Sequence, residues 1–334
     1  MTNFPIGRFP VVAASPQVDG GKFPAKAFQG EVLPFTATAF REGHDQLAVE
    51  LVLTAPSGKT QRLPMTCVNP GLDLWTTKAQ LAEIGLYSYQ ISAWDDEMAT
   101  WLHNTEVKLA AGVDEELMML EGQALLDRFA KAATKTVASK FDSISKILGD
   151  SKLSPSQRFE KALAASLAEL AAANPLRARE SLSQPLEILC ERKLAGSGKW
   201  YEFFPRSEGA KQKKDGTWVS GNFKTAKASL ARVKEMGFDV LYLPPIHPIG
   251  TTHRKGKNNS LTAAAGEPGS PWAIGAKEGG HDTIHPDLGS KSDFKAFIKA
   301  ADKLGIEIAM DLALQASPDH PWVTAHPEWF TTRA

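Results

Sequence analysis

The C-terminal part of the chain alternates apolar strand patterns with amphipathic helix patterns, and this alternation restricts the possible folds most strongly. Segment 239–243 is short and continuously apolar, as in a parallel strand that is covered on both faces. Helix patterns over 223–236 and 292–304 flank it, and both are followed by glycine. Segment 306–311 is the next strand and ends at an acid. Repeated strand–helix units predict a parallel sheet, either open or closed into a barrel.

The first part of the chain, to about residue 106, has a different pattern that is rich in β-forming and turn residues. Segments 31–40, 47–54 and 85–94 alternate apolar and polar side chains, which places one face of each strand on a core. The β-pattern returns at 186–192. Short strands separated by Pro and Gly turns predict an antiparallel sandwich.

Between these strand patterns the period becomes helical. Acids open a helix at Asp114, and Ser154 followed by proline opens another. Segment 159–173 is dense in Ala and Leu and stops at Asn174. We expect a small bundle that packs on itself and also contacts a second subunit, and the apolar stripe of its first helix should include Leu117, Leu120, Ala124 and Phe129.

Composition excludes several classes of protein. The chain has 38 Lys plus Arg and 38 Asp plus Glu, so it lacks the excess of cations that drives bulk attraction to nucleic acid. No apolar run is long enough to span a bilayer, and no secretory signal is visible at the N-terminus. Cys67 and Cys190 lie far apart, which fits free thiols in a reducing cytoplasm.

Candidate chemistry lies at the ends of the parallel strands, because active sites of such sheets form at the C-terminal ends of the strands. Segments 204–207, 244–289 and 311–320 occupy these positions. The middle one is far longer than an ordinary strand-to-helix connection, and loops of that length are usually functional or disordered. Backbone amides of this loop can bind polyol or phosphate oxygens, together with the side chains of Arg254, Lys255 or Lys257.

Four strings in this region, GFDVLYLPPIHPIG, RKGKNNS, GGHDTIHPDLGS and GIEIAMDLALQASPDHPW, resemble the first half of an α-amylase-type (β/α)8 barrel. The similarity is closest to the α-1,4-glucan:maltose-1-phosphate maltosyltransferase family of bacterial glycogen and α-glucan synthesis, and it extends over almost the whole chain. The resemblance implies transfer of maltosyl units from α-maltose 1-phosphate to the non-reducing end of an α-1,4-glucan, with release of phosphate. It also implies retention of configuration through a covalent glycosyl–enzyme intermediate.

The resemblance assigns two residues to binding of α-maltose 1-phosphate, Lys255 and Gln315. Without the resemblance, Lys255 is interpreted as part of a solvated basic loop. Gln315 is then interpreted as a polar residue at the end of a strand that forms a hydrogen bond with a neighbouring loop. Ordinary α-amylases have Asn and His where this chain has Gln315 and Ala316, which favours the transferase. Asp311 is expected to orient loops, while Asn258 and Asn259 position the long loop or touch sugar.

The resulting domain prediction has three parts. Residues 1–106 with about 185–198 form a β-sandwich, 107–184 form a helical insertion, and 199–334 form the first strands and helices of an incomplete barrel. A complete (β/α)8 barrel takes about 250 residues, roughly twice the length of this last part. Retaining chemistry needs two carboxylates, which the resemblance places on later strands, beyond residue 334. We therefore expect a truncated chain that is inactive alone.

No cofactor or metal is expected. His247, His281, His285 and His320 lack the spacing of a zinc site, and the acids near His285 lack that of an EF-hand.

Two other functions stay open. The chain can be a non-catalytic glucan-binding or assembly module acting through Trp75, Trp94 or Trp101, although aromatic residues of this kind more often fill a core. It can also be an open-sheet sugar-phosphate enzyme, but a glycine-rich phosphate fingerprint is missing.

Overall fold

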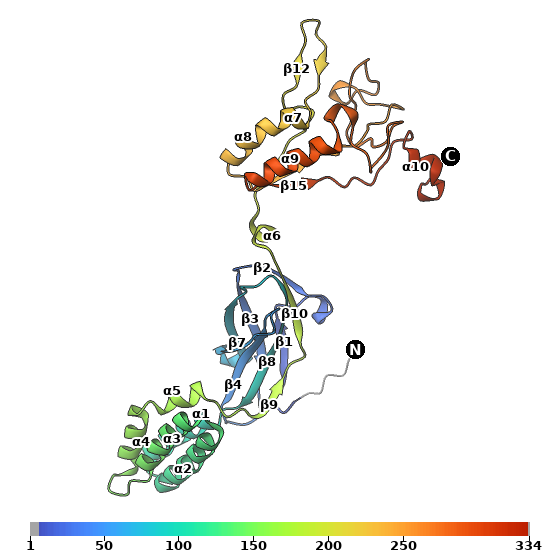
Figure 1. Ribbon diagram of the computed structural model, residues 1–334. Helices are drawn as coiled ribbons and strands as arrows, with labels where there is room; N and C mark the ends of the chain where they lie inside the picture. The colour runs from blue at the N-terminus through green and yellow to red at the C-terminus, as the bar shows by residue number, and fades with distance from the viewer. Residues whose placement is uncertain (1–6, 333–334) are drawn as a thin grey trace. The chain divides into compact units, whose positions relative to one another are not determined.

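The computed structural model describes residues 7–332. The chain separates into two compact units, Met1–Gly196 and Ser197–Ala334. Both units combine strands with helices, and the first unit holds most of the strands (Figure 1). The predicted mixed architecture with a β-rich N-terminal part is therefore confirmed.

The first unit contains two sheets that share one core. One sheet is antiparallel and has the order β1 (Val11–Ser15), β3 (Val32–Ala39), β7 (Leu74–Gln80), β6 (Thr66–Asn69). The other has the order β2 (Ala25–Phe28), β10 (Leu186–Glu191), β8 (Gly85–Asp95), β4 (Leu47–Thr54), β5 (Thr60–Pro64), and β9 (Ala178–Leu182) pairs with β8. The returning strand β10 lies between β2 and β8, so it is integral to this sheet.

Alternation along the strands builds the core between these sheets. Along strand β3 every second side chain is buried and those between are exposed or half-buried, and Phe35 is fully buried. Its ring meets the ring of Tyr89 from the other sheet edge to face, with centroids 5.1 Å apart. Leu51 and Ile91 of the second sheet are also fully buried in this cluster. Contacts of this kind hold the sheets together through apolar burial.

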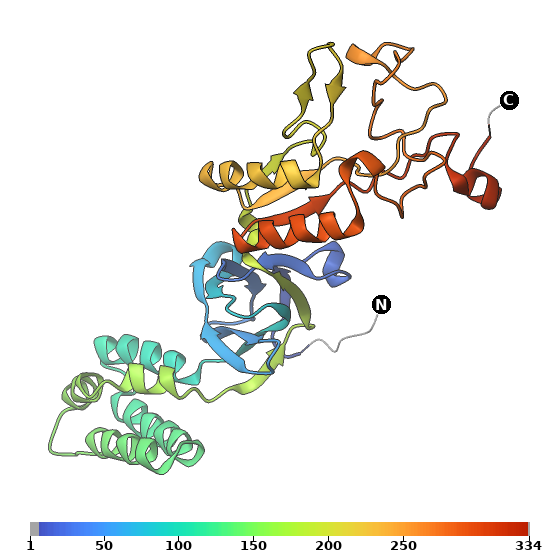
Figure 2. The ribbon, with the colours of Figure 1, turned by 45° about the horizontal axis from the view of Figure 1, so that its top comes forward.

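Helices occupy the chain between β8 and β9 (Figure 2). They are α1 (Glu97–Ala111), α2 (Glu115–Ala132), α3 (Lys135–Leu148), α4 (Pro155–Ala164) and α5 (Leu167–Ala173). They share their own apolar core, which confirms the predicted self-packing. The predicted start of α4 is correct, because Ser154 forms a capping box with Gln157 and proline occupies the first turn.

The bounds of the helical region differ from the expected 107–184 at both ends. Helix α1 begins at Glu97 because the Asp96 side chain accepts the Ala99 amide at 2.9 Å and caps it. The return strand β9 already begins at Ala178. Inside the region, the expected helix 159–173 breaks at Ser166, whose φ of 58° is left-handed.

The predicted stripe of α2 has the wrong phase. Leu117 and Leu120 are 47% and 61% exposed, and Ala124 is also exposed. Of the four predicted residues, only Phe129 is buried. The buried face instead consists of Met118, Met119, Gly122, Leu125, Leu126 and Phe129.

Buried ion pairs lie in the second sheet, near the points where the chain leaves this sheet for the helices and returns to it. Asp95, at the end of β8, is 3% exposed and pairs with Arg41 and Arg179. Glu50 of β4 is 5% exposed and accepts from Arg177 Nε at 2.7 Å. Removing one partner of such a buried pair leaves an uncompensated charge, so these pairs hold the sheet at these points.

The second unit contains a parallel sheet of order β11 (Trp200–Glu202), β14 (Val240–Leu243), β15 (Glu307–Met310). Helices α7 (Phe223–Ala226) and α8 (Leu230–Glu235) connect the first pair of strands, and α9 (Lys291–Lys303) connects the second. The connection after β11 also carries a small hairpin, β12 (Lys211–Gln212) and β13 (Trp218–Val219). The predicted helix 223–236 contains a 3-10 step at Lys227–Ser229. The short helix α10 (Pro321–Ala325) follows β15, and another short helix, α6 (Lys193–Ser197), lies where the first unit ends and the second begins.

Phenylalanines hold the helices of this unit on the sheet. The ring of Phe223 lies 5.7 Å from that of Phe297 on α9, and Phe203 lies 6.3 Å from Phe297. Leu241 and Leu243 of β14 are fully buried in the same cluster. This packing fixes the direction of the strands, so the loops that leave their C-terminal ends start from a rigid frame.

Candidate functional site

Two loops leave neighbouring strands of the parallel sheet at their C-terminal ends, and one carboxylate ties them together. The first loop runs from residue 244 to 290, and the second follows Met310. Asp319 Oδ2 accepts the amides of Thr251 and Thr252 at 2.6 and 2.7 Å. Both threonine hydroxyls also donate to this carboxylate, at 3.0 and 2.5 Å. These hydrogen bonds stabilise the ionised carboxylate and hold the pKa of Asp319 far below its usual range. The side chain and amide of Thr252 have the largest effect, and those of Thr251 have a smaller one.

Further contacts fix the same two loops on each other. The Ser317 amide donates to the Ile274 carbonyl at 2.7 Å. Trp272 Nε1 donates to Asp311 Oδ2 at 2.7 Å, so the acid that follows β15 holds a side chain of the long loop. A Cβ on Gly250 would lie 1.9 Å from Ser317 Oγ, which explains why this position of the loop has no side chain.

Two of the histidines form a chain of hydrogen bonds whose direction follows from one backbone amide. The Trp322 amide donates to His320 Nδ1 at 3.1 Å, so this nitrogen carries no proton. His320 is neutral in this arrangement, and its Nε2–H donates to His281 Nδ1 at 3.0 Å. The remaining proton, on His281 Nε2, is directed to the Ala313 carbonyl at 2.7 Å. The pair therefore acts as a neutral connector between the loops.

Burial favours the neutral form of three of these histidines. It lowers the pKa of His320, His247 and His285 from the ordinary value. His247 Nδ1 lies 2.9 Å from the Thr283 carbonyl, and His285 Nδ1 accepts the Asp287 amide at 3.1 Å. Across residues 7–332, no group of three or more His, Cys, Asp or Glu side chains is arranged to hold a metal ion.

Lys255, one of the two residues predicted to bind α-maltose 1-phosphate, directly follows Arg254, whose side chain folds into the long loop. Arg254 donates to the carbonyls of Ile249 and Gly250 at 2.7 and 2.8 Å, so its guanidinium is engaged in the loop itself. Lys255 is half-buried, and its ammonium makes no hydrogen bond or ion pair within the described part of the chain. It lies three residues after Thr252, which Asp319 holds.

The two asparagines that follow have left-handed backbone conformations. The φ values of Asn258 and Asn259 are 54° and 59°, and asparagine tolerates this region better than most residues. They lie in the turn just after Lys255 in which the Gly256 amide donates to the Ser260 carbonyl at 3.0 Å.

Gln315, the second residue predicted to bind α-maltose 1-phosphate, is exposed and lies four residues before Asp319. Its neighbours Leu312 and Leu314 are 79% and 82% exposed. Within residues 7–332 the Gln315 amide has no hydrogen-bond partner. Asp319 thus ties together the loops that carry Lys255 and Gln315. The side chains of these two residues have polar groups that make no hydrogen bond within the described residues.

The tryptophans of the binding-module alternative have structural partners. Trp94 and Trp101 are 5% and 6% exposed. Trp101 lies in helix α1 rather than in a strand, and its Nε1 donates to the Met118 carbonyl at 2.8 Å. Trp75 Nε1 donates to the Ala39 carbonyl at 3.0 Å. These contacts agree with the core-filling interpretation and give no support to sugar stacking by these residues.

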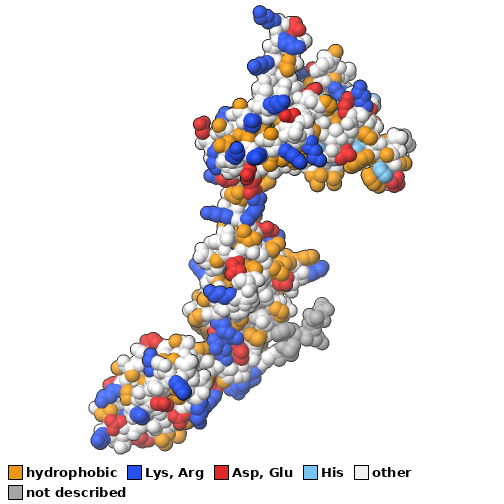
Figure 3. Space-filling view, viewed as in Figure 1, with side chains coloured by type: hydrophobic (Ala, Val, Ile, Leu, Met, Phe, Trp, Pro, Cys, Tyr) orange, Lys and Arg blue, Asp and Glu red, His pale blue; other side chains and the backbone are white. Residues whose placement is uncertain are grey.

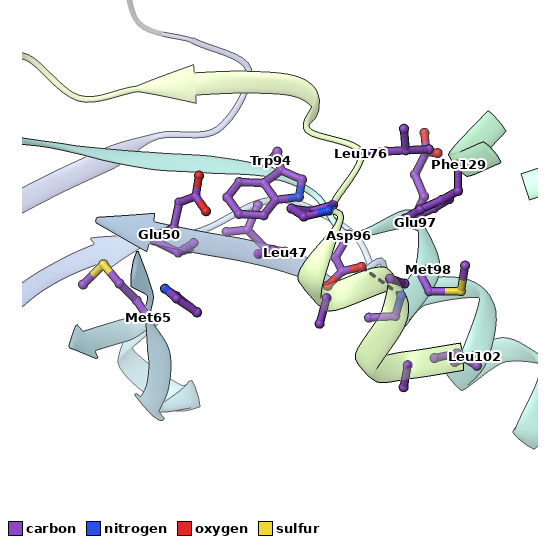
Figure 4. A pocket seen from close by; sticks show the side chains of 18 of the residues that line it. Leu47, Glu50, Met65, Trp94, Asp96, Glu97, Met98, Leu102, Phe129 and Leu176 are labelled. Atoms are coloured by element: carbon purple, nitrogen blue, oxygen red, sulfur yellow. Dashed lines mark hydrogen bonds between the residues drawn. The ribbon is translucent and has the colours of Figure 1, made fainter. Parts of the chain in front are cut away.

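A pocket of about 350 Å³ lies between strand β4 and the helices α1 and α5 of the first unit. Trp94 lies beside Leu47 in its wall, and Met98 and Leu102 line the side that α1 forms (Figure 4). The Arg177 guanidinium lies 5.3 Å from the centre of the Trp94 ring and covers one face of it. The pocket is mainly apolar, so its lining does not match the polar demands of maltose 1-phosphate.

Asp319 and the two threonines that it holds were not predicted from the sequence. Asp319 lies in the loop that follows β15, directly before His320. No repeat or spacing in the sequence indicates that an Asp will contact a residue of a distant loop. Only the paired Thr-Thr at the turn of the long loop offers a signal, since two adjacent hydroxyls and amides can share one carboxylate.

No helix within residues 7–332 has the length and apolar character to cross a membrane.

A family model described as α-1,4-glucan:maltose-1-phosphate maltosyltransferase, domain N/S, matches residues 7–192. That range holds both sheets of the first unit and its inserted helices, more than half of the chain.

Relatives of the same description match the chain along almost its whole length. Maltosyltransferase 1 of Streptomyces coelicolor is 46% identical over 98% of this chain and 48% of its own length. The enzymes of Mycolicibacterium smegmatis and Mycobacterium tuberculosis are 41% and 42% identical over 97% of this chain. The chain spans about half the length of the curated relatives it matches. It belongs to the α-1,4-glucan:maltose-1-phosphate maltosyltransferase family.

Proposed function

We propose that this chain supplies the donor-binding loops of a maltosyltransferase. The enzyme moves maltosyl units from α-maltose 1-phosphate to the non-reducing ends of α-1,4-glucans and releases phosphate. The single observation that carries the proposal is the tie between two strand-end loops through Asp319, since those loops bear Lys255 and Gln315 with unused polar groups. The Lys255 ammonium suits a phosphate or sugar oxygen, and the Gln315 amide suits a diol.

The chemistry itself needs a nucleophile and an acid/base, each a carboxylate. We propose that both lie beyond residue 334 and that the reaction retains configuration by double displacement. Strands β11, β14 and β15 are then the first strands of a (β/α)8 barrel, and the two sheets of the first unit form a β-sandwich with a helical insertion. Parallel pairing of the three strands and the shared core of the two sheets support this. We also propose a cytoplasmic location, which free Cys67 and Cys190 fit.

Calorimetric titration of the 334-residue chain with α-maltose 1-phosphate tests donor binding. Replacing Lys255 or Gln315 by Ala should weaken binding by about tenfold, the loss expected for a hydrogen bond to a charged or buried polar partner. Lys277→Ala is the matched control, because Lys277 is exposed in the same loop. Equal affinities for all these variants would contradict the assignment. Phosphate release by this chain alone, with a maltooligosaccharide acceptor, would contradict the placement of the carboxylates.

We further propose that the chain forms a homodimer through helix α2. Leu117, Leu120 and Ala124 share one face at helical spacing and are exposed. Sedimentation velocity should show a dimer that Leu120→Glu dissociates. Leu72→Glu, at a residue 65% exposed elsewhere in the same unit, should leave it intact. A monomeric wild-type chain would refute the proposal.

A further inference from the structure

The hairpin between β11 and α7 projects away from the sheet and helices of its unit (Figures 1 and 2). Its register places Gln212 opposite Trp218 and Lys211 opposite Val219. Asp215 and Gly216 make the turn: Gly216 has a φ of 86°, and the Asp215 carboxylate accepts the Thr217 amide at 2.9 Å. The hairpin is thus a defined structure with its own turn chemistry.

The base of the hairpin is firmly held. The Gly221 amide donates to the Arg206 carbonyl at 2.7 Å. Arg206 Nη1 donates to Ser220 Oγ at 3.0 Å and to Asp287 Oδ2 at 3.2 Å. A Cβ on Gly221 would lie 2.1 Å from the Glu208 carbonyl oxygen, so the two ends of the hairpin approach as closely as glycine allows. The side chains on the hairpin are therefore presented from a fixed base.

Trp218 is 69% exposed, more than Trp200 at 57% or Trp329 at 59%. Within residues 7–332, no aromatic ring or cation packs on its indole. Because directly opposed residues of a hairpin point to the same face, the exposed Gln212 amide lies beside this ring. Its Nε2 donates to the Gly216 carbonyl at 3.1 Å, which fixes the amide and leaves Oε1 as an acceptor.

We propose that the Trp218–Gln212 face of this hairpin binds an α-1,4-glucan chain. An indole offers a flat apolar surface for the C–H face of a pyranose ring, and an amide offers a donor and an acceptor for its hydroxyls. The neighbour of Trp218 on this face is uncharged, whereas Lys211 pairs with Val219 on the opposite face. A neutral polyol fits this arrangement better than a polyanion.

The place of the hairpin in the fold agrees with this ligand. It follows the C-terminal end of β11, and the loops with Lys255 and Gln315 follow the C-terminal ends of β14 and β15. The choice of α-1,4-glucan rests on the proposed function, in which this edge of the sheet holds the donor. A glucan bound at Trp218 would be retained on the same edge as the reaction. Cationic side chains lie at the free end of the hairpin, which includes Lys213 and Lys214 (Figure 3). Because of these charges, a polyanion is the alternative ligand that the test must exclude.

Affinity electrophoresis of the 334-residue chain in native gels with soluble glycogen tests the proposal. Glycogen should retard the wild-type chain, and Trp218→Ala should raise the dissociation constant about two- to tenfold, the range expected for loss of one aromatic contact. Trp218→Phe should retain most of the affinity, and Gln212→Ala should lose part of it. Trp200→Ala is the matched control, because Trp200 is exposed at the opposite end of β11.

The results separate this inference from the proposed function. No retardation of the wild-type chain, or equal losses for Trp218→Ala and Trp200→Ala, would overturn the inference. Retardation by heparin that needs Trp218 and disappears at high salt, without retardation by glycogen, would assign the hairpin to a polyanion instead and also overturn it. Glycogen binding that needs Trp218, in a chain that does not bind α-maltose 1-phosphate, would leave the inference standing and refute the proposed function.

Discussion

At the scale of single residues, Asp319 does the most to shape the candidate site. One carboxylate serves two amides and two hydroxyls of the neighbouring loop. Bonds of this kind are stronger than neutral ones because the acceptor is ionised. Lys255 and Gln315 are each within four residues of this tie, so the geometry of both depends on a residue that need not touch the donor.

Replacing Asp319 by Ala should free the long loop from its neighbour. The Thr251 and Thr252 amides should exchange their hydrogens about tenfold faster or more, since each loses a bond to a charged acceptor. Hydrogen-exchange mass spectrometry of a peptide covering these residues measures this. Asp302→Ala, at an exposed residue near the end of α9, should leave the exchange unchanged. Unaltered exchange in Asp319→Ala would show that other contacts suffice to hold the loop.

The buried histidines predict a pH dependence of stability. His320, His247 and His285 have pKa values below the ordinary 6.5, so below that pH the unfolded chain binds protons that the folded chain refuses. The free energy of unfolding should therefore be constant at higher pH and decrease as the pH falls below about 6.5. Urea titrations at pH 7.5, 6.5 and 5.5 measure the slope.

A non-titrating variant identifies the group responsible. His320→Asn keeps an acceptor for the Trp322 amide and should flatten the slope, because one proton is no longer excluded on folding. The exposed His44 serves as the control, and His44→Asn should keep the wild-type slope. A stability that rises between pH 6.5 and 5.5 would contradict the neutral histidine chain.

At the scale of elements, the crossing of α1 and α2 depends on a glycine. A Cβ at Gly122 would lie 2.2 Å from the ring of Trp101, so the two helices approach to a distance that only glycine permits. Trp101 is also bonded to the Met118 carbonyl, one turn before Gly122, and cannot easily move away. Local propensity alone disfavours a glycine inside a helix.

Gly122→Ala should therefore destabilise the first unit even though Ala is the better helix former. Overpacking of a core costs about 1–3 kcal/mol, more than the gain of about 1 kcal/mol in helix propensity. Thermal unfolding followed by circular dichroism should show the loss. Asp127→Asn, at an exposed residue of the same helix, should change the stability little. An increase in melting temperature for Gly122→Ala would mean that the helices can separate without cost.

At the scale of the whole molecule, each unit contains its own apolar core. The clusters of the sheets and of the inserted helices both lie within Met1–Gly196. The second unit has a separate cluster around Leu241. In the described residues its edge strand β15 has β14 as its strand neighbour, and Met310 is 45% exposed. Such an edge lowers the stability of a sheet and invites association.

The chain should consequently unfold in two steps in urea, with the second unit unfolding first. A protein of residues 7–196 should fold alone and unfold in one step at the same urea concentration as the later step of the full chain. Circular dichroism and tryptophan fluorescence, measured on both proteins, test this. One coincident transition for the full chain would show that the two units fold as a single cooperative body.

The sequence by itself determined the element types, the change from strands to helices and back, and the family. Alternation over 47–54 and the Ser154 capping signal are local, so they survive any tertiary arrangement. Tertiary structure alone decided the phase of α2 and the meeting of Asp319 with two threonines far away along the chain. Which face of a helix is buried, and which distant donors reach a carboxylate, depend on packing between segments, and no local pattern encodes that packing.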